Sequence, residues 1–130
     1  MNQLINRIFK IWAYTVSHNF LIIRSPMKFP DQDDYNEDSK YNIDIEFSSV
    51  AYLDIPTILK GIELQEIIKD DEIPENLLKF KLDSYKIFRL KSEHEFYYIV
   101  ASNLSIGINK WINQDKIMNF KLKHDEILDI

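Results

Sequence analysis

The sequence contains no cysteine and only two glycines in 130 residues. The absence of cysteine excludes disulfides, thiolate nucleophiles, iron–sulfur clusters and cysteine-based zinc sites. Gly61 and Gly107 are isolated, so the sequence has no glycine-rich loop of the kind that cradles nucleotide phosphates. No apolar run approaches the roughly 18 to 20 residues of a membrane-spanning helix, and the amino terminus has no secretory signal pattern. We therefore expect a cytoplasmic protein without a cofactor and without a membrane partner.

The remaining composition is that of a folded protein with an acidic balance. Hydrophobic residues make up 45% of the chain, which predicts a packed core, and the length fits a single domain over residues 1–130. There are 21 acidic and 16 basic side chains, a formal net charge of −5. Such a balance disfavours a general phosphate-binding surface, so we expect no nucleic-acid partner.

The amino-terminal pattern predicts a helix over residues 2–16. Its apolar side chains recur at spacings of three and four residues, so a helix would carry them on one stripe. These side chains are Leu4, Ile5, Ile8, Phe9, Trp12 and Val16. We expect this helix to pack on a sheet. A strand from Ile11 to Val16 stays open as an alternative, because Trp, Tyr, Thr and Val also suit strands.

Most later segments resemble strands. Phe20–Arg24 is an apolar run that predicts a buried strand, in which the Arg24 guanidinium needs a carboxylate or carbonyl partner. The segments 85–90 and 96–100 flank a short polar stretch, which predicts an antiparallel hairpin. These elements together predict an α+β protein, with a mainly antiparallel β-sheet and the N-terminal helix packed on one face.

Residues 42–48 alternate between apolar and polar side chains. Because strand side chains alternate at period two, this segment predicts a strand with one buried and one exposed face. We expect Ile43, Ile45 and Phe47 to point into the core. Asp44 and Glu46 are expected to point to solvent or to a partner.

Residues 26–40 form a long loop that begins an acidic segment. Between Asp31 and Glu46, seven acidic side chains stand against the single Lys40, a net charge of −6. Acidic charge interspersed with aromatic residues suits a basic protein partner, because complementary charge speeds association and aromatic anchors supply affinity. The candidate partner-binding residues are Asp31, Asp33, Asp34, Tyr35, Glu37, Asp38, Asp44 and Glu46. The alternative is a solvated loop whose charges only maintain solubility.

Other chemical sites are weakly supported by the pattern. Asp31, Asp33 and Glu37 lack the central glycine and the ligand order of a calcium loop. The clusters 93–95 and 124–126 each contain one histidine between or beside carboxylates, but their spacing does not direct the side chains to one metal. A small hydrolase that uses His18 or His124 stays a minor alternative, since no spacing selects a catalytic set. We therefore predict no catalytic and no metal-binding residues.

A second acidic stretch covers residues 63–75, in which six acidic side chains stand against Lys69, a net charge of −5. If it lay beside the first acidic segment, the two would form one large negative patch.

The first half of the chain resembles small bacterial immunity proteins of polymorphic-toxin and contact-dependent growth-inhibition systems. The resemblance is carried by Ser17-His18, Leu21-Ile22-Ile23-Arg24-Ser25-Pro26, Ile43-Asp44-Ile45-Glu46-Phe47, Val50-Ala51-Tyr52-Leu53-Asp54-Ile55-Pro56-Thr57 and Lys60-Gly61-Ile62. It implies a non-enzymatic protein that binds and blocks one cognate toxin domain. A basic nuclease toxin would fit an acidic patch that covers its active-site surface. A structural or regulatory interaction module without a toxin is the alternative.

Overall fold

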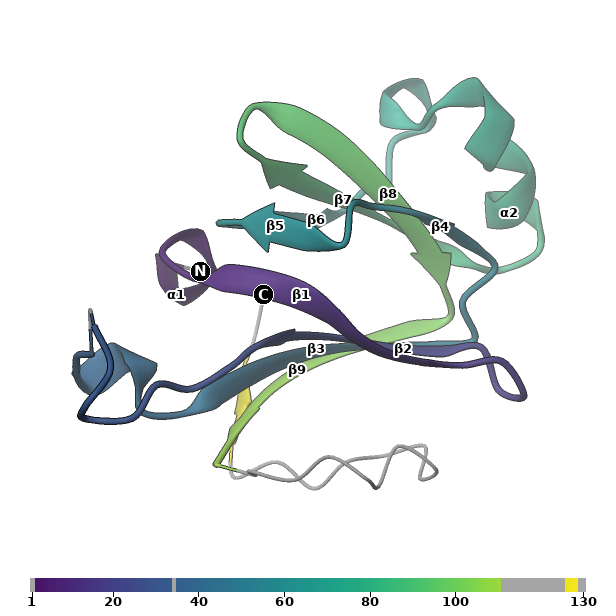
Figure 1. The fold of residues 1–130 in the computed structure, drawn as a ribbon. Coiled ribbons are helices and arrows are strands. Elements are labelled where there is room, and N and C mark those ends of the chain that lie inside the picture. The colour runs from purple at the N-terminus through teal and green to yellow at the C-terminus, as the bar shows by residue number, and fades with distance from the viewer. Residues whose placement is uncertain (1, 34, 111–125, 129–130) are drawn as a thin grey trace.

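The computed structural model describes residues 2–33, 35–110 and 126–128, which form two antiparallel β-sheets and a few short helices (Figure 1). The first sheet has the strand order β10 (Glu126–Leu128), β9 (Asn103–Asn109), β3 (Asn42–Ser48), β2 (Phe20–Ser25), β1 (Ile8–Thr15) and β5 (Ile58–Lys60). The second sheet has the order β4 (Tyr52–Asp54), β8 (Glu95–Ala101), β7 (Lys86–Ser92) and β6 (Glu63–Glu66). All neighbouring strands in both sheets run antiparallel. The predicted mainly antiparallel β-sheet is confirmed, although its strands form two sheets, and the α+β arrangement with an N-terminal helix packed on one face is not observed.

The helical elements of the described residues are short. The α-helices are α1 (Asn2–Ile5) and α2 (Leu78–Leu82), and the 3₁₀ helices are η1 (Glu37–Ser39), η2 (Asp70–Glu72) and η3 (Glu75–Leu77).

The predicted helix over residues 2–16 is wrong, because most of that segment is strand β1. β1 pairs with β2 on one side and with β5 on the other. Its register with β2 shifts between Ile11 and Ala13, which is a β-bulge. The burial of β1 alternates along the strand, but apolar side chains lie on both of its faces, with Ile8 and Trp12 exposed and Phe9 buried, so the sequence shows no alternation of apolar and polar residues. The alternative of a strand-rich start is the one that the structure supports.

The main core lies between the two sheets. Phe9, Ile45 and Phe47 of the first sheet meet Phe88 and Ile99 of the second, and all five are buried. The rings of Phe47 and Phe88 make an edge-to-face contact with centroids 5.5 Å apart. The predicted inward direction of Ile43, Ile45 and Phe47 is therefore confirmed.

Four connections carry the chain from one sheet to the other, namely β3 to β4, β4 to β5, β5 to β6 and β8 to β9. β8 continues through Ser102 into β9, and β3 leads to β4 through a turn in which Ser49 has a φ of 53°. Strands that bend between sheets form the corners of a closed sandwich. The segment from η2 to α2 packs on the outer face of the second sheet, where it buries Ile73 and Leu77 against Ile87 and Val100.

The predicted hairpin is confirmed as β7 and β8, which pair from Lys86↔Ala101 to Ser92↔Glu95. Its two turn residues, Glu93 and His94, have φ values of 51° and 71°. Positive φ at both central residues matches the twist of a two-residue hairpin turn.

Candidate functional site

The segment 26–41, which we call the acidic loop, connects β2 to β3 and is held by hydrogen bonds at both of its ends. The Met27 amide donates to Asn42 Oδ1 at 2.7 Å, and the Lys28 amide donates to the Ser39 carbonyl at 2.7 Å. Near the tip, the Phe29 amide donates to Gln32 Oε1 at 2.6 Å. The 3₁₀ helix η1 follows with a capping box between Asn36 and Ser39. The described loop residues, 26–33 and 35–41, are therefore fixed by hydrogen bonds despite the length of the loop.

Arg7, which precedes β1, joins the two ends of the acidic loop. Its guanidinium donates to the Ser25 carbonyl at 2.9 Å and to the Tyr41 carbonyl at 2.8 Å, and its Nε donates to Ser25 Oγ at 2.8 Å. The same guanidinium lies 5.5 Å from the centroid of the Tyr41 ring. The planar fork of arginine suits such multiple contacts. This role of Arg7 could not be predicted from the sequence, because its partners lie 18 and 34 residues away along the chain.

The structure leaves three of the predicted loop acids exposed, namely Asp31, Asp33 and Glu37. Tyr35 is half-buried, whereas Phe29 is 44% exposed and adds an apolar side chain to the acidic surface. Asp34 and the side chain of Asp38 lie outside the described part of the structure. The acidic loop thus combines exposed carboxylates with one exposed aromatic ring.

One loop carboxylate has a basic neighbour. Lys40 Nζ lies 2.7 Å from Glu37 Oε2, and both side chains are exposed. The hydrogen bond and the positive charge of Lys40 lower the pKa of Glu37 below its usual value. The same contact raises the pKa of Lys40, since it stabilises the ammonium form. The pair therefore stabilises the ionised forms of both side chains.

Asp44 and Glu46 do not belong to this exposed surface, so the prediction that they point to solvent or to a partner is wrong. Asp44 is 0% and Glu46 is 7% exposed. Period-two alternation determines which side chains share a face of a strand, but it does not determine whether that face is exposed. Here β3 lies inside a six-stranded sheet, and Asp44 lies opposite Arg24 of β2. The polar face of β3 is therefore a buried polar layer.

This layer is a chain of hydrogen bonds centred on Asp44. Arg24 donates from Nε and Nη2 to the two carboxylate oxygens at 2.5 and 2.6 Å, which confirms that Arg24 has a carboxylate partner. Asn109 Nδ2 donates to Asp44 Oδ2 at 2.9 Å, and Asn42 Nδ2 donates to Asn109 Oδ1 at 2.8 Å. The Arg24 guanidinium also stacks on Trp12, 5.1 Å from the ring centroid. Asn42 Oδ1 in turn accepts a hydrogen bond from the Met27 amide, and this bond connects the buried polar layer to the acidic loop.

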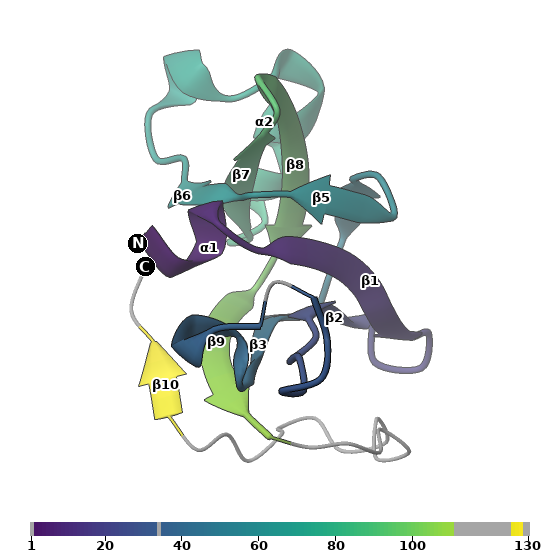
Figure 2. The ribbon, with the colours of Figure 1, turned by 60° about the vertical axis from the view of Figure 1, so that its left-hand side comes forward.

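The second acidic stretch does not extend the acidic loop. It runs through β6 and η2 toward η3, beside α2. In both views the acidic loop (dark blue) and the segment around α2 (teal) lie at opposite ends of the molecule (Figures 1 and 2). The two acidic segments therefore do not form one patch.

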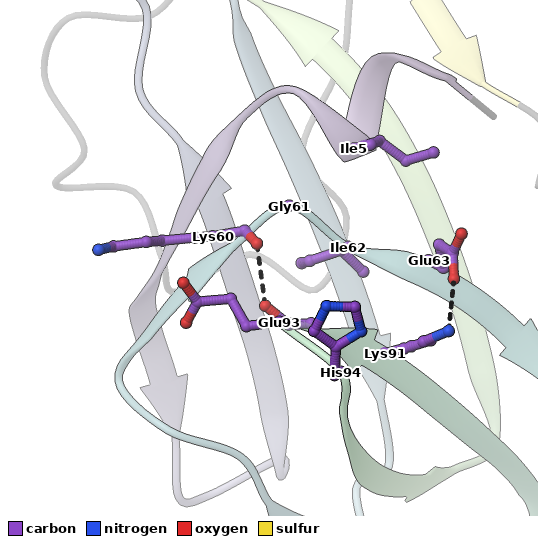
Figure 3. A pocket seen from close by; sticks show the side chains of 9 residues that line it. Ile5, Lys60, Gly61, Ile62, Glu63, Lys91, Glu93 and His94 are labelled. Atoms are coloured by element: carbon purple, nitrogen blue, oxygen red, sulfur yellow. Dashed lines mark hydrogen bonds and ion pairs between the residues drawn. The ribbon is translucent and has the colours of Figure 1, made fainter.

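The two described histidines, His18 and His94, do not share a pocket. His94 lines an open hollow of about 300 Å³ together with Lys60, Glu63, Lys91 and Glu93 (Figure 3). His18 lies in the turn between β1 and β2, and His124 is outside the described residues. Among the described residues no group of His, Asp and Glu could hold a metal ion.

No family model, curated protein or solved structure matches the chain. None of the helices described in the structure has the length and apolar character needed to cross a membrane.

Proposed function

We propose that this chain is a non-enzymatic binding protein that neutralises a cognate toxin domain, like the immunity proteins that its sequence resembles. The observation that carries the proposal is the acidic loop: Asp31, Asp33 and Glu37 are exposed on a backbone held by Arg7 and by the side-chain oxygen of Asn42. A loop with a defined backbone loses less conformational entropy on binding than a flexible one. The loop is therefore suited to recognition as well as to solubility.

The chemistry of the loop selects a basic partner. Residues 26–41 contain five acidic and two basic side chains, and complementary charge accelerates association. Phe29 supplies an exposed aromatic ring that can enter an apolar pocket at the centre of an interface. A nuclease toxin fits these requirements, because it binds phosphates through basic side chains. The carboxylates would occupy the phosphate positions and cover the active-site surface.

The proposal excludes Asp44 and Glu46 from the binding surface, since both are buried. Asp44 instead joins β3 to Arg24 of β2 and to Asn109 of β9. A regulatory module that binds another basic protein would use the same loop, so the identity of the partner distinguishes the two functions.

The experiment begins with co-purification of the tagged protein with the product of the neighbouring gene, followed by a growth assay in which that product is expressed alone or with this protein. Association kinetics are then measured at low and high salt for the parent and for the variant D31N/D33N/E37Q. The matched control is D71N/E72Q/E75Q, which removes the same charge from exposed residues at the opposite end of the molecule.

The loop variant should associate about tenfold more slowly at low salt, and its rate should depend less on salt. The control should retain most of the parent rate, because its charges lie far from the loop. Both variants should keep the fold, since exposed substitutions change stability by about 0.5 kcal/mol or less each. A loop variant that associates as fast as the parent and still protects cells would disprove the proposed surface.

A further inference from the structure

A second surface, on the outer face of β1 and β5, has the opposite charge. Phe9 of β1 and Leu59 of β5 are buried in the core, so their neighbours on each strand point to the other side of the sheet. We call this surface the β1–β5 face. It consists of Ile8, Lys10, Trp12, Ile58 and Lys60.

The β1–β5 face combines aliphatic and basic side chains in a regular arrangement. Ile8 lies opposite Lys60, and Lys10 lies opposite Ile58, so each isoleucine has a lysine as its cross-strand neighbour. Ile8 is 52% and Ile58 is 50% exposed, and Trp12 is 38% exposed. Exposed apolar side chains of this size gain free energy when a partner covers them.

The charge of the face contrasts with that of the whole chain. β1 and β5 contain two lysines and no acidic residue, whereas the chain has a net charge of −5. The ion pairs between described residues use Arg24, Lys40, Lys81 and Lys91, and neither Lys10 nor Lys60 takes part in one. A partner for this face must therefore be acidic and must also present apolar side chains.

The acidic loop has these two properties. It presents Asp31 and Asp33 to solvent together with Phe29. Arg7 immediately precedes β1 and bonds to both ends of the loop, so the loop and the start of the β1–β5 face lie at the same end of the molecule. In Figure 2 β1, β5 and the loop (dark blue) all face the viewer. Two copies related by a two-fold axis could then make the loop-to-face contact twice.

We propose that the β1–β5 face binds the acidic loop of a second copy of this chain, so that the free protein is a dimer in which the two loops are covered. In this dimer the lysines of one copy lie against the loop carboxylates of the other, and Ile8 and Ile58 pack against Phe29. An isologous interface of this kind closes at two copies. Because the toxin proposed above would use the same loop, the second copy and the toxin would compete for it.

The test is a charge-reversal exchange followed by analytical ultracentrifugation over a dilution series. The variant K10E/K60E reverses the face, and D31K/D33K reverses the loop. Each variant alone should be monomeric, because both contacts then bring like charges together. An equimolar mixture should form a heterodimer, since the reversed face now meets the reversed loop and the second contact is unchanged. The control K69E/K86E changes two exposed lysines outside the face and should stay dimeric.

The parent should be a dimer at about 0.1 M salt and should dissociate at about 1 M salt, where the Debye length falls to about 3 Å. A monomeric parent at every concentration would overturn the proposal, as would a dimeric K10E/K60E variant or a mixture that stays monomeric. Circular dichroism establishes that each variant is folded. The variant K10E/K60E retains the acidic loop and should still bind the toxin, so failure of the dimer and failure of the proposed function are distinguishable.

Discussion

Arg24 and Asp44 form a buried bidentate ion pair, with the guanidinium Nε and Nη2 atoms 2.5 and 2.6 Å from the two carboxylate oxygens. The pair joins neighbouring strands at the centre of the six-stranded sheet. Burial removes both charges from water, and that penalty is offset only while each charge keeps its partner. The pair therefore makes the register between β2 and β3 sensitive to either residue.

Removal of one partner should be severely destabilising. We expect Asp44→Ala to lower the free energy of unfolding by about 3–5 kcal/mol, because it leaves the Arg24 charge buried without its carboxylate. The measurement is urea unfolding followed by circular dichroism. Asp31→Ala, in the exposed loop, serves as the control and should cost about 0.5 kcal/mol or less.

A double variant tests whether the charge or the lost packing is responsible. Replacement of both partners by apolar residues, as in R24M/D44L, removes both buried charges together. It should be less destabilised than Asp44→Ala alone, since no charge is left uncompensated. If the double variant lost more stability than the single one, packing around the pair would matter more than its electrostatics.

The sequence identified this pair in part. Arg24 in an apolar strand required a polar partner, and the structure supplies Asp44. The alternation of residues 42–48 predicted the strand and the inward face correctly, but it could not show that the opposite face is buried. On that face Asp44 contacts Arg24 of β2 and Asn109 of β9, and these contacts join residues far apart in sequence.

The same limitation explains the error at the amino terminus. Local spacing favoured a helix over residues 2–16, whereas the pairing of β1 with β2 and β5 determines a strand. The exposed face of β1 carries Ile8 and Trp12, and the inner face carries Phe9, so the sequence lacked the apolar–polar alternation that would have identified the strand. By contrast, β7 and β8 were predictable because their pairing is local and their turn is short. The acidic loop was visible as charge, but its anchor Arg7 was not.

Arg7 should control the order of the acidic loop. We expect Arg7→Ala to increase amide hydrogen exchange at Met27 and Lys28 and to lower stability by about 1.5–3 kcal/mol, because hydrogen bonds from a charged donor to carbonyls at both loop ends are lost. Arg7→Lys keeps the charge without the planar fork and should restore only part of the protection. Unchanged exchange at these two amides in Arg7→Ala would show that the loop is anchored without Arg7.

The pair Glu37–Lys40 predicts a pH dependence of the loop. Lys40 lowers the pKa of Glu37 in the folded protein. The stabilisation from this contact is therefore fully present above the pKa of Glu37 in the unfolded chain, and it is lost as the pH falls through the lower pKa of the folded state. NMR titration of the Glu37 side-chain carboxyl carbon measures this directly. Lys40→Ala should raise the pKa of Glu37 toward its ordinary value, whereas Lys28→Ala removes a loop lysine that contacts Asp33 instead and should leave it unchanged. Equal effects of the two substitutions would mean that general loop charge, and not the specific contact, lowers the pKa.

Gly61 lies between β5 and β6 and packs against the amino-terminal segment that contains Ile5 and Arg7. Its φ is 71°, and a Cβ added there would lie 2.5 Å from the Ile5 carbonyl oxygen. Its amide donates to the Arg7 carbonyl at 2.8 Å, and the next amide, of Ile62, donates to the Leu4 carbonyl at 3.0 Å. Gly61→Ala therefore combines an unfavourable left-handed conformation with a backbone clash, and we expect a loss of about 2–5 kcal/mol in urea unfolding. Thr57→Ala, an exposed change just before β5, should be nearly neutral.

Because the clash displaces the residues that lead into β1, Gly61→Ala should also increase hydrogen exchange at the Met27 and Lys28 amides, since Arg7 bonds to the ends of the acidic loop. Normal stability in Gly61→Ala would show that the turn can rearrange without cost.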